Sequence, residues 1–375
     1  METAPFEPWN DEDAKPLIRF KGVQKKFGDF TAIHNLSLDI FEKEFFALLG
    51  PSGCGKTTMM RMLAGFETPT TGSIELAGQD IVGVPPNKRS VNMMFQSYAL
   101  FPHLSIWDNI AFGLKRDRLS KTEIDARVEE MLRLTRLERF AKRKPHQISG
   151  GQRQRVALAR SLAKAPKLLL LDEPLAALDK KLRQDTQFEL MDIQEKTGTT
   201  FVIVTHDQEE AMTVASRVAV MDEGRLMQVS TPDVIYEAPN SVYVADFIGD
   251  VNIISGIARA NGNGRYGVHW GDAQTPVRAM SERPFQDGQD CHLAIRPEKI
   301  SISETKPEQA DNMIEGKVLD IAYLGNLSTY HVEVSGGQII KAQTANTRRI
   351  SKRSITWEDT VWLSWTETAG VLLDQ

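Results

Sequence analysis

Apolar and polar residues follow one rhythm from Leu17 to about residue 243. Short, strongly apolar runs at 45–49, 168–171 and 201–206 alternate with segments whose apolar residues recur at helical spacing. Such runs are typical of strands buried on both faces of a parallel sheet. Helices are expected at 56–64, 108–114, 122–137, 180–196 and 208–215, and most of 97–165 is expected to be helical. The alternation predicts an α/β fold with a largely parallel sheet.

The rhythm changes near residues 240–250. Beyond this point, segments such as HLAIR, STYHVEV and TVWLSW alternate apolar and polar residues and are separated by turns rich in glycine and asparagine. This pattern predicts an all-β domain. The start of the chain is acidic and contains several prolines, which is typical of disorder. We therefore expect a disordered tail at 1–16, an α/β domain at 17–243 with a helical subdomain at about 97–165, and an all-β domain at 244–375.

Composition narrows the class of protein. The 375 residues include 45 basic and 50 acidic side chains, for a formal net charge of −5. This balance argues against a nucleic-acid binder, which needs many cations to neutralise phosphates. Two cysteines cannot form a disulfide framework, so a reducing, cytoplasmic compartment is expected. Because no apolar run approaches the roughly 18 residues that span a bilayer, and the start is unlike a signal peptide, work at a membrane is expected to depend on partners.

A glycine-rich segment lies between the apolar run at 45–49 and the first predicted helix. It fits the pattern G-x-x-x-x-G-K-[ST], in which backbone amides close around phosphate oxygens, Lys56 reaches the β- and γ-phosphates and the Thr57 hydroxyl holds Mg²⁺. An ordinary glycine-rich turn is the alternative, but the strand before and the helix after it favour a nucleotide site. The expected phosphate-binding residues are Gly50, Pro51, Ser52, Gly53, Cys54, Gly55, Lys56, Thr57 and Thr58.

The apolar run at 168–171 ends in two acids, Asp172 and Glu173. A carboxylate at the end of a buried strand can approach the Mg²⁺ of the nucleotide, which suits Asp172. Glu173 faces the other way and can act as a general base toward an attacking water. Two acids after a strand usually begin a solvated loop, but together with the phosphate loop they predict nucleotide hydrolysis.

Further segments match the motifs of one family in order and spacing. The segment QISGGQ at 147–152 matches the family signature, with Ile148 where leucine is usual. Gln96 matches a glutamine loop and His206 a switch histidine. Over about residues 17–240 the chain therefore resembles the ATP-binding cassette (ABC) ATPases. Each match alone has an ordinary alternative, such as a surface histidine, and their joint occurrence is what carries the resemblance.

The resemblance implies roles for three groups of residues, with ATP and Mg²⁺ as cofactors. The catalytic group is Gln96, Glu173 and His206. Mg²⁺ would be held by Thr57, Gln96 and Asp172. Besides the phosphate loop, ATP would contact Phe27, Ser149, Gly150, Gly151, Gln152 and Asp179, the last within a segment Ala176-Ala177-Leu178-Asp179 that has alanine where serine is frequent.

The resemblance also implies a dimer. In the family, the signature binds a γ-phosphate held by the opposite subunit, through helix-end amides. This chain has one phosphate loop and one signature, so a complete site needs two chains. A head-to-tail homodimer with two sandwiched ATP molecules is the simplest expectation, and hydrolysis would let it open.

The C-terminal segment resembles the oligonucleotide/oligosaccharide-binding-like (OB-like, TOBE) regulatory domain of importer ATPases. LAIRPE at 293–298 and YLGN at 323–326 carry this likeness. Such barrels can bind nucleic acid, but residues 246–375 contain more acids than bases. The implied role is a dimer-stabilising or regulatory module, and no nucleic-acid partner is expected.

Three functions remain to be weighed: an importer ATPase, a soluble ABC ATPase of repair or translation, and a nucleotide sensor without turnover. The stretch 58–147 has no room for a repair-type coiled coil, translation members normally carry two cassettes, and Glu173 and His206 argue against a sensor. ABC exporters remain possible, but the importer-type C-terminal segment argues against them. The importer interpretation implies two transmembrane permease subunits, a periplasmic or extracellular solute-binding protein, and a peripheral position on the cytoplasmic face of the inner membrane.

Within importers, the segments at 92–103, 140–174 and 205–213 look most similar to the polyamine branch, nearest the putrescine system's ATPase. This resemblance implies powering of putrescine uptake, with spermidine, ferric iron and sugar importers as alternatives. Residues Ser97–His103 are expected to meet a short cytoplasmic helix of the permease.

Cys54 lies inside the phosphate loop, two residues before Lys56. Helix-end amides and a neighbouring cation favour a thiolate, so a reactive cysteine is one expectation. The alternative is that the loop merely requires a small residue.

Overall fold

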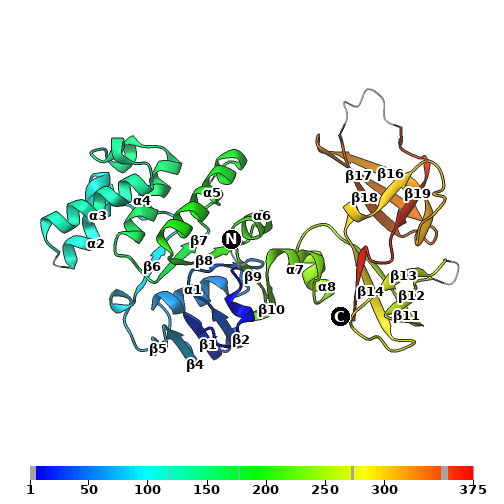
Figure 1. Cartoon of the computed structure of the whole chain (residues 1–375), viewed down its shortest axis with the longest axis horizontal. Coiled ribbons are helices and arrows are strands. Elements are labelled where there is room, and N and C mark those ends of the chain that lie inside the picture. The colour runs from blue at the N-terminus through cyan, green and yellow to red at the C-terminus, as the bar shows by residue number, and fades with distance from the viewer. Residues whose placement is uncertain (1–5, 118, 177, 272–273, 348–353, 375) are drawn as a thin grey trace. The chain divides into compact units, whose positions relative to one another are not determined.

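The computed structural model describes residues 6–117, 119–176, 178–271, 274–347 and 354–374. These residues form two compact units, Met1–Pro232 and Asp233–Gln375 (Figure 1). The division falls before the boundary expected at 243/244, because α7 (Pro232–Glu237) and α8 (Val242–Phe247) are tied to the second unit. There the Arg296 guanidinium donates hydrogen bonds to backbone carbonyls of both helical segments, including those of Tyr236 and Ala245.

A six-stranded sheet forms the centre of the first unit. Its order is β10-β9-β3-β8-β7-β6, with parallel pairing except between β9 and β10. The strands are β3 (Phe45–Leu49), β6 (Val91–Met94), β7 (Leu168–Asp172), β8 (Thr200–Thr205), β9 (Arg217–Asp222) and β10 (Arg225–Ser230). The predicted parallel sheet is confirmed. Its carboxyl edge brings together the residues that follow β3, β6, β7 and β8.

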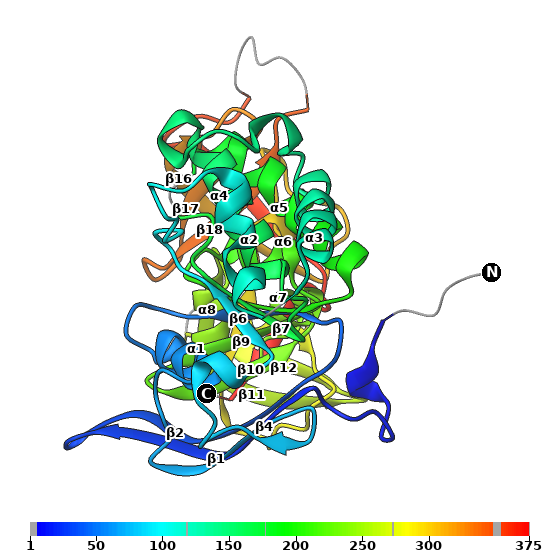
Figure 2. The same ribbon diagram turned by 90° about the vertical axis from the view of Figure 1, so that its left-hand side faces the viewer.

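A second, antiparallel sheet was not predicted as a separate layer. It has the order β2-β1-β4-β5, with β1 (Ile18–Phe27), β2 (Phe30–Ile40), β4 (Thr71–Leu76) and β5 (Gln79–Asp80) (Figure 2). One apolar core joins this sheet, α1 (Lys56–Ala64) and the central sheet. The buried side chains Met59, Met60 and Met62 of α1 contribute to that core. The helix that follows the phosphate loop is therefore packed tightly in place.

The helices form where the periodicity predicted them. They are α2 (Ile106–Arg116), α3 (Lys121–Leu134), α4 (Gly150–Leu162), α5 (Lys180–Thr197) and α6 (Gln208–Val214), with short 3₁₀ turns at Pro86–Lys88, Glu138–Phe140 and Pro145–Gln147. Side chains of Ser105, Ser120 and Ser149 cap the first three of these helices. The helix α3 ends earlier than predicted, since Thr135 caps it and Arg136 adopts a positive φ of 56°.

The N-terminal segment has more structure than the expected disordered tail. Residues Pro8–Asn10 form a 3₁₀ turn, and the Trp9 ring lies 4.8 Å from the Arg217 guanidinium. Arg217 is itself buried and paired with Glu44 at 2.7 Å. The described part of the tail, from Phe6 onward, thus contacts Arg217, the first residue of β9, while residues 1–5 lie outside the described residues.

The second unit is all-β apart from α7, α8 and a 3₁₀ turn at Pro297–Lys299, as its alternating pattern predicted. One antiparallel sheet contains β13 (Val277–Met280), β12 (Arg265–His269), β11 (Asn252–Gly262), β14 (Asp290–Ile295) and β20 (Gly370–Leu373). The other contains β15 (Ser301–Ser303), β19 (Thr360–Trp365), β16 (Asn312–Tyr323), β17 (Leu327–Val334) and β18 (Ile339–Ala345). Both sheets contribute to one large apolar core, and a smaller cluster joins α8 to Ala294 and Leu373.

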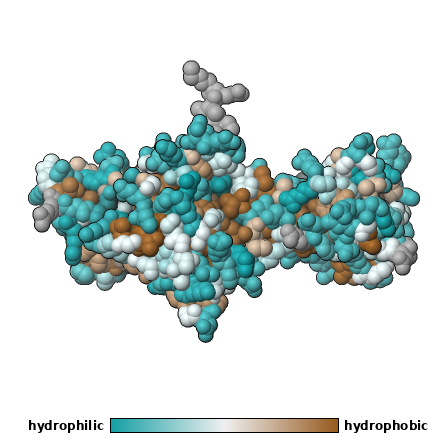
Figure 3. Space-filling view, turned by 90° about the horizontal axis from the view of Figure 1, so that it is seen from below, coloured by the Kyte–Doolittle hydropathy of each residue, from teal (hydrophilic) through white to brown (hydrophobic). Residues whose placement is uncertain are grey.

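The surface carries both hydrophilic and apolar residues. Figure 3 shows hydrophilic residues over most of one face, with apolar residues reaching the surface in several places. In the first unit the exposed large apolar side chains include Phe66, Phe95, Phe112 and Phe188. Within the described residues, no helix combines the length and hydropathy that crossing a bilayer requires.

Candidate functional site

The phosphate loop connects β3 to α1 and depends on two glycines. A Cβ at Gly50 would lie 2.3 Å from the Met221 carbonyl oxygen, and Gly55 adopts a φ of 107°. Larger residues would therefore displace the loop from the sheet. The Lys56 ammonium is buried and donates hydrogen bonds to the Gly50 and Pro51 carbonyls, at 2.6 and 2.9 Å. The loop thus encloses its own cation at the positive end of a nine-residue helix, which is a setting for phosphate.

Cys54 does not have the environment of a reactive thiolate. Its side chain is 3% exposed, and burial raises the pKa of the thiol. The nearby Lys56 ammonium, 3.6 Å from Sγ, lowers the pKa by less than burial raises it. Of the two expectations for Cys54, this environment does not favour the thiolate. A Cβ on Gly50 would lie 2.7 Å from Sγ, so the space fits the alternative of a small residue in a crowded loop.

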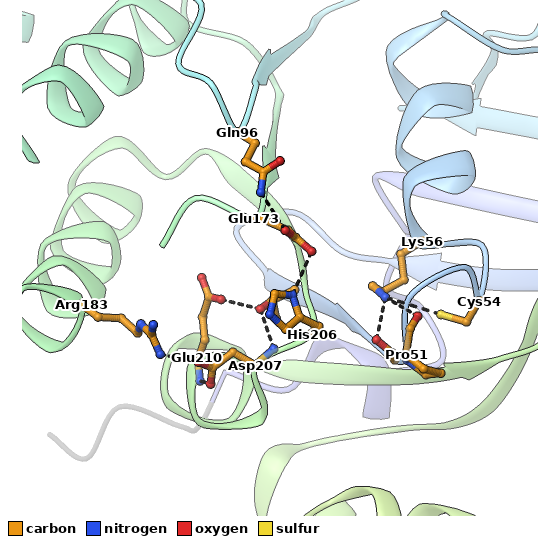
Figure 4. Close-up of polar contacts among 11 residues, drawn as sticks. Pro51, Cys54, Lys56, Gln96, Glu173, Arg183, His206, Asp207 and Glu210 are labelled. Atoms are coloured by element: carbon orange, nitrogen blue, oxygen red, sulfur yellow. Dashed lines mark hydrogen bonds and ion pairs between the residues drawn. The ribbon is translucent and has the colours of Figure 1, made fainter. Parts of the chain in front are cut away.

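Three predicted catalytic side chains meet at the carboxyl edge of the sheet (Figure 4). Gln96 follows β6, Glu173 follows β7 and His206 follows β8. The Gln96 amide donates to one Glu173 oxygen at 3.0 Å, and Nδ1 of His206 lies 2.9 Å from the other. Glu173 adopts a φ of 43°, which ends the strand and turns its side chain toward both partners. The carboxylate is thus held from two sides.

Asp172 is the last residue of β7 and lies next to this cluster in the chain. Burial, reinforced by the Glu173 charge, raises the pKa of its carboxyl group, and Arg61 opposes the shift. A carboxylate in such a place is stabilised by an arriving cation. Within the described residues, no three His, Cys, Asp or Glu side chains form a metal cluster. The expected ligands are the Asp172 carboxylate, the Thr57 hydroxyl and the Gln96 amide. This small set fits Mg²⁺, which keeps several waters and takes phosphate oxygens as further ligands.

The signature segment forms the start of α4. The Ser149 hydroxyl accepts a hydrogen bond from the Gln152 amide at 3.3 Å, and the Gln152 side chain accepts from the Ser149 amide at 2.9 Å. This capping box leaves other first-turn amides available to an anion. In the described part of the chain, no hydrogen bond joins residues 149–152 to the phosphate loop or to Glu173. The structure therefore does not bring the signature into the site of its own chain.

Two further predicted contacts lie apart from the cluster. Asp179 caps α5, where its carboxylate accepts from the Leu182 amide at 3.0 Å. Phe27 ends β1 with 46% of its surface exposed, and the Lys25 ammonium lies 4.6 Å from its ring centre. An aromatic ring with this much exposed surface can stack on a flat ligand. Ala177, part of the predicted segment before Asp179, lies outside the described residues.

Comparison with known proteins identifies the family. A model described as ABC transporter matches residues 33–176. The putrescine transport ATP-binding protein PotG of Escherichia coli is 51% identical over 96% of this chain and 95% of its own length. The chain belongs to the ATP-binding proteins of ABC transporters. A spermidine/putrescine import ATP-binding protein, PotA of Rubrobacter xylanophilus, is 48% identical over 90% of this chain and 89% of its own.

The C-terminal unit and the fold agree with this family. A TOBE domain model matches residues 293–373, in line with the expected OB-like module. The ATP-binding cassette MJ0796, solved as a post-hydrolysis dimer with ADP and phosphate, is 33% identical over 57% of this chain and 98% of its own, with a TM-score of 0.51. The protein cbiO1 of Clostridium perfringens, part of an ABC transporter complex, has a TM-score of 0.56 at 29% identity, over 59% of this chain and 90% of its own. The expected ABC-type ATPase is confirmed.

Three charged side chains around His206 were not predicted from any motif. Asp207 caps α6, Arg183 pairs with Asp207 at 2.6 Å, and the buried Glu210 accepts from the Thr205 hydroxyl (Figure 4). Asp207 and Glu210 follow the histidine within the segment THDQEE, so the sequence shows them. Their partner Arg183 lies on another helix, so only the fold reveals the connection.

Proposed function

We propose that this chain is the ATP-hydrolysing subunit of an importer for polyamines, with putrescine as the first candidate and spermidine as the second. The observation that supports this most is the 51% identity to the putrescine transport ATP-binding protein over nearly the whole of both chains. Polyamines are multiply charged cations, and a bilayer opposes their passage because desolvating charge is costly. Uptake against a gradient therefore requires an energy source, which ATP hydrolysis supplies.

Hydrolysis would join water to the γ-phosphorus and release ADP and phosphate. In this proposal, the loop amides and Lys56 bind the phosphates, while Thr57, Asp172 and Gln96 hold Mg²⁺, which supplies charge neutralisation when bound. Glu173 accepts the proton of the attacking water. The 3.0 and 2.9 Å contacts to Gln96 and His206 fix the orientation of the Glu173 carboxylate. The exposed Phe27 stacks on the adenine.

Each complete site would use two copies of this chain. The signature residues Ser149–Gln152 form a capped helix start that has no hydrogen bond to the phosphate loop within the described residues. A second copy placed head to tail would bring that helix start to the γ-phosphate. The dimeric state of the related MJ0796 supports this arrangement. The C-terminal OB-like unit would then serve as a dimer-stabilising or regulatory module.

The chain would work with two permease subunits and a solute-binding protein, as a peripheral subunit on the cytoplasmic face of the inner membrane. Residues Ser97–His103, directly after Gln96, are the proposed contact with a short permease helix. Phe101 in this segment packs on the partly exposed ring of Phe112 at 4.3 Å between ring centres. Partly exposed aromatic rings of this kind are typical of protein interfaces.

Uptake and hydrolysis test the proposal together. Deleting the gene from a strain with no other polyamine uptake system should abolish uptake of labelled putrescine, and the wild-type gene should restore it. The Glu173→Gln variant should not restore it, and its hydrolysis should fall by at least about a hundredfold while ATP binding persists, because an amide cannot take the proton.

Glu358→Gln is the matched control. Glu358 also has a positive φ, at 68°, but lies in the second unit with an exposed side chain. This variant should restore uptake fully. Unchanged putrescine uptake in the deletion strain would reject the substrate, and near-normal hydrolysis by Glu173→Gln would reject the role of the base.

A further inference from the structure

The Arg183 side chain connects two loops of the site. From α5 its NH1 donates to Oδ2 of Asp207 at 2.6 Å (Figure 4). Its NH2 donates to the Leu178 carbonyl at 3.3 Å. Asp207 directly follows His206, whereas Leu178 lies in the segment between Glu173 and α5. The Nε atom of Arg183 is buried and has no partner among the described residues, so the two terminal nitrogens anchor the guanidinium.

The Asp207 residue is fixed on three sides. One carboxylate oxygen receives Arg183, the other accepts from the Glu210 amide at 3.0 Å, and the Asp207 amide donates to the Thr205 hydroxyl at 2.9 Å. His206, by contrast, has 57% of its side chain exposed, so packing restrains its ring only weakly. The direction of the ring toward Glu173 therefore depends on where its backbone is held.

We infer that Arg183 is a positioning residue, which holds the His206 loop so that Nδ1 faces the Glu173 carboxylate. The inference rests on the proposed function, since it matters only if Glu173 is the base. Arginine suits the task because its planar fork reaches two acceptors in fixed directions, whereas a lysine ammonium presents a single point charge. A small displacement of a group that orients a base is costly to turnover.

Kinetics give the first test. Arg183→Gln should lower kcat by about tenfold or more, because a misplaced positioning group raises the free energy of the transition state. KM for MgATP should change by no more than about twofold, because ground-state binding uses the phosphate loop. Asp207→Asn should have the same effect while keeping its helix cap, since asparagine caps well. The double variant should be no worse than the poorer single variant, because both substitutions break one connection. Arg183→Lys should fall between wild type and Arg183→Gln.

The chain offers a matched control in a second ion pair that α5 makes, with Arg155 of α4. Arg155 pairs with Glu189 of α5, and the two side chains are 29% and 25% exposed, the same values as for Arg183 and Asp207. Arg155→Gln should therefore destabilise the chain to a similar extent without moving His206. If Arg155→Gln lowered kcat as much as Arg183→Gln, the effect would belong to general helix packing and the inference would be wrong.

A spectroscopic readout separates positioning from activity. With ¹⁵N-labelled histidine, assigned by a His206→Gln variant, wild type should show the proton of His206 on Nδ1, which faces the carboxylate at 2.9 Å. In Arg183→Gln the signal should move toward that of free histidine, and in Arg155→Gln it should stay. If Glu173→Gln hydrolysed ATP at the wild-type rate, the proposed role of Glu173 as the base would fail while the histidine signal still tested the positioning. If Glu173→Gln were inactive but Arg183→Gln kept both the wild-type kcat and signal, the positioning role alone would be rejected. Should Arg183→Gln not fold, Arg183→Lys provides the same comparison.

Discussion

At the scale of single residues, Glu210 has the most perturbed environment near the site. Its side chain is 2% exposed, its Oε1 has no hydrogen-bond partner within the described residues, and the Thr205 hydroxyl donates to the other oxygen. Burial raises the pKa of this carboxyl group from 4.5 to about 7. The folded protein therefore binds a proton here under conditions in which the unfolded chain has released it.

This shift predicts a pH dependence of stability. Because the pKa is raised on folding, the stabilisation by the protonated Glu210 is complete below pH 4.5 and is lost as the pH rises to about 7. Between these limits the free energy of unfolding of the wild type should fall by up to about 3 kcal/mol through this group. Glu210→Gln stays neutral and should not show this fall. Urea unfolding at pH 5 and pH 7.5, for wild type and variant, measures it. A pH profile shared by both proteins would contradict the assignment.

A residue's role could be predicted from the sequence where its contacts follow from nearby residues or from the order of the strands, and not where its partners are distant in the sequence. The meeting of Gln96, Glu173 and His206 follows from strand ends that share one edge of a parallel sheet. The pKa of Cys54 could not be predicted, because residues distant in sequence supply its burial. Arg183 was missed for a similar reason, since its partner Asp207 lies 24 residues further along.

At the scale of elements, one side chain joins α7 and α8 to the β-structure of the second unit. Arg296 is 4% exposed and donates to the carbonyls of Ala245, Gly249, Asp250 and Tyr236. Buried carbonyls without a partner are costly. Arg296→Ala should therefore destabilise this unit by on the order of 3 kcal/mol, and hydrogen exchange should quicken over 242–250. Arg283→Ala, which removes an exposed bond to Asn240, is the control and should change little. Equal exchange in both variants would reject this linking role.

Periodicity predicted the existence of the elements better than their limits or partners. The period of apolar residues indicates whether a segment is a helix or a strand, so α5 and β8 were found almost residue by residue. The end of α3 at Leu134 depends on a local backbone choice at Arg136, which periodicity does not reveal. The separate antiparallel sheet β2-β1-β4-β5 depends on which strands pair, and alternation alone leaves pairing open.

At the scale of the whole molecule, the proposed functional unit is larger than the chain. The phosphate loop and the signature lie in one sequence, but no hydrogen bond joins them within the described residues. If two copies exchange signatures, each site of the dimer takes its loop from one chain and its signature from the other. Two variants that each damage one half should then complement each other.

The test combines Lys56→Ala, which removes the loop cation, with Gly150→Asp, which puts a negative charge where the γ-phosphate would lie. Gly150 has open space around it, since its nearest neighbour to an added Cβ is an Arg153 nitrogen at 3.9 Å. An acid in the first turn of a helix also favours the helix, so the variant should fold. Each variant alone should hydrolyse little ATP.

In a mixed dimer, one site combines both defects and the other has neither. Random pairing of a two-fold dimer should therefore restore about a quarter of wild-type activity, measured as phosphate release from an equal mixture. Activity no greater than that of the separate variants would mean that one chain supplies both halves of its own site, because then no pairing could assemble an intact one.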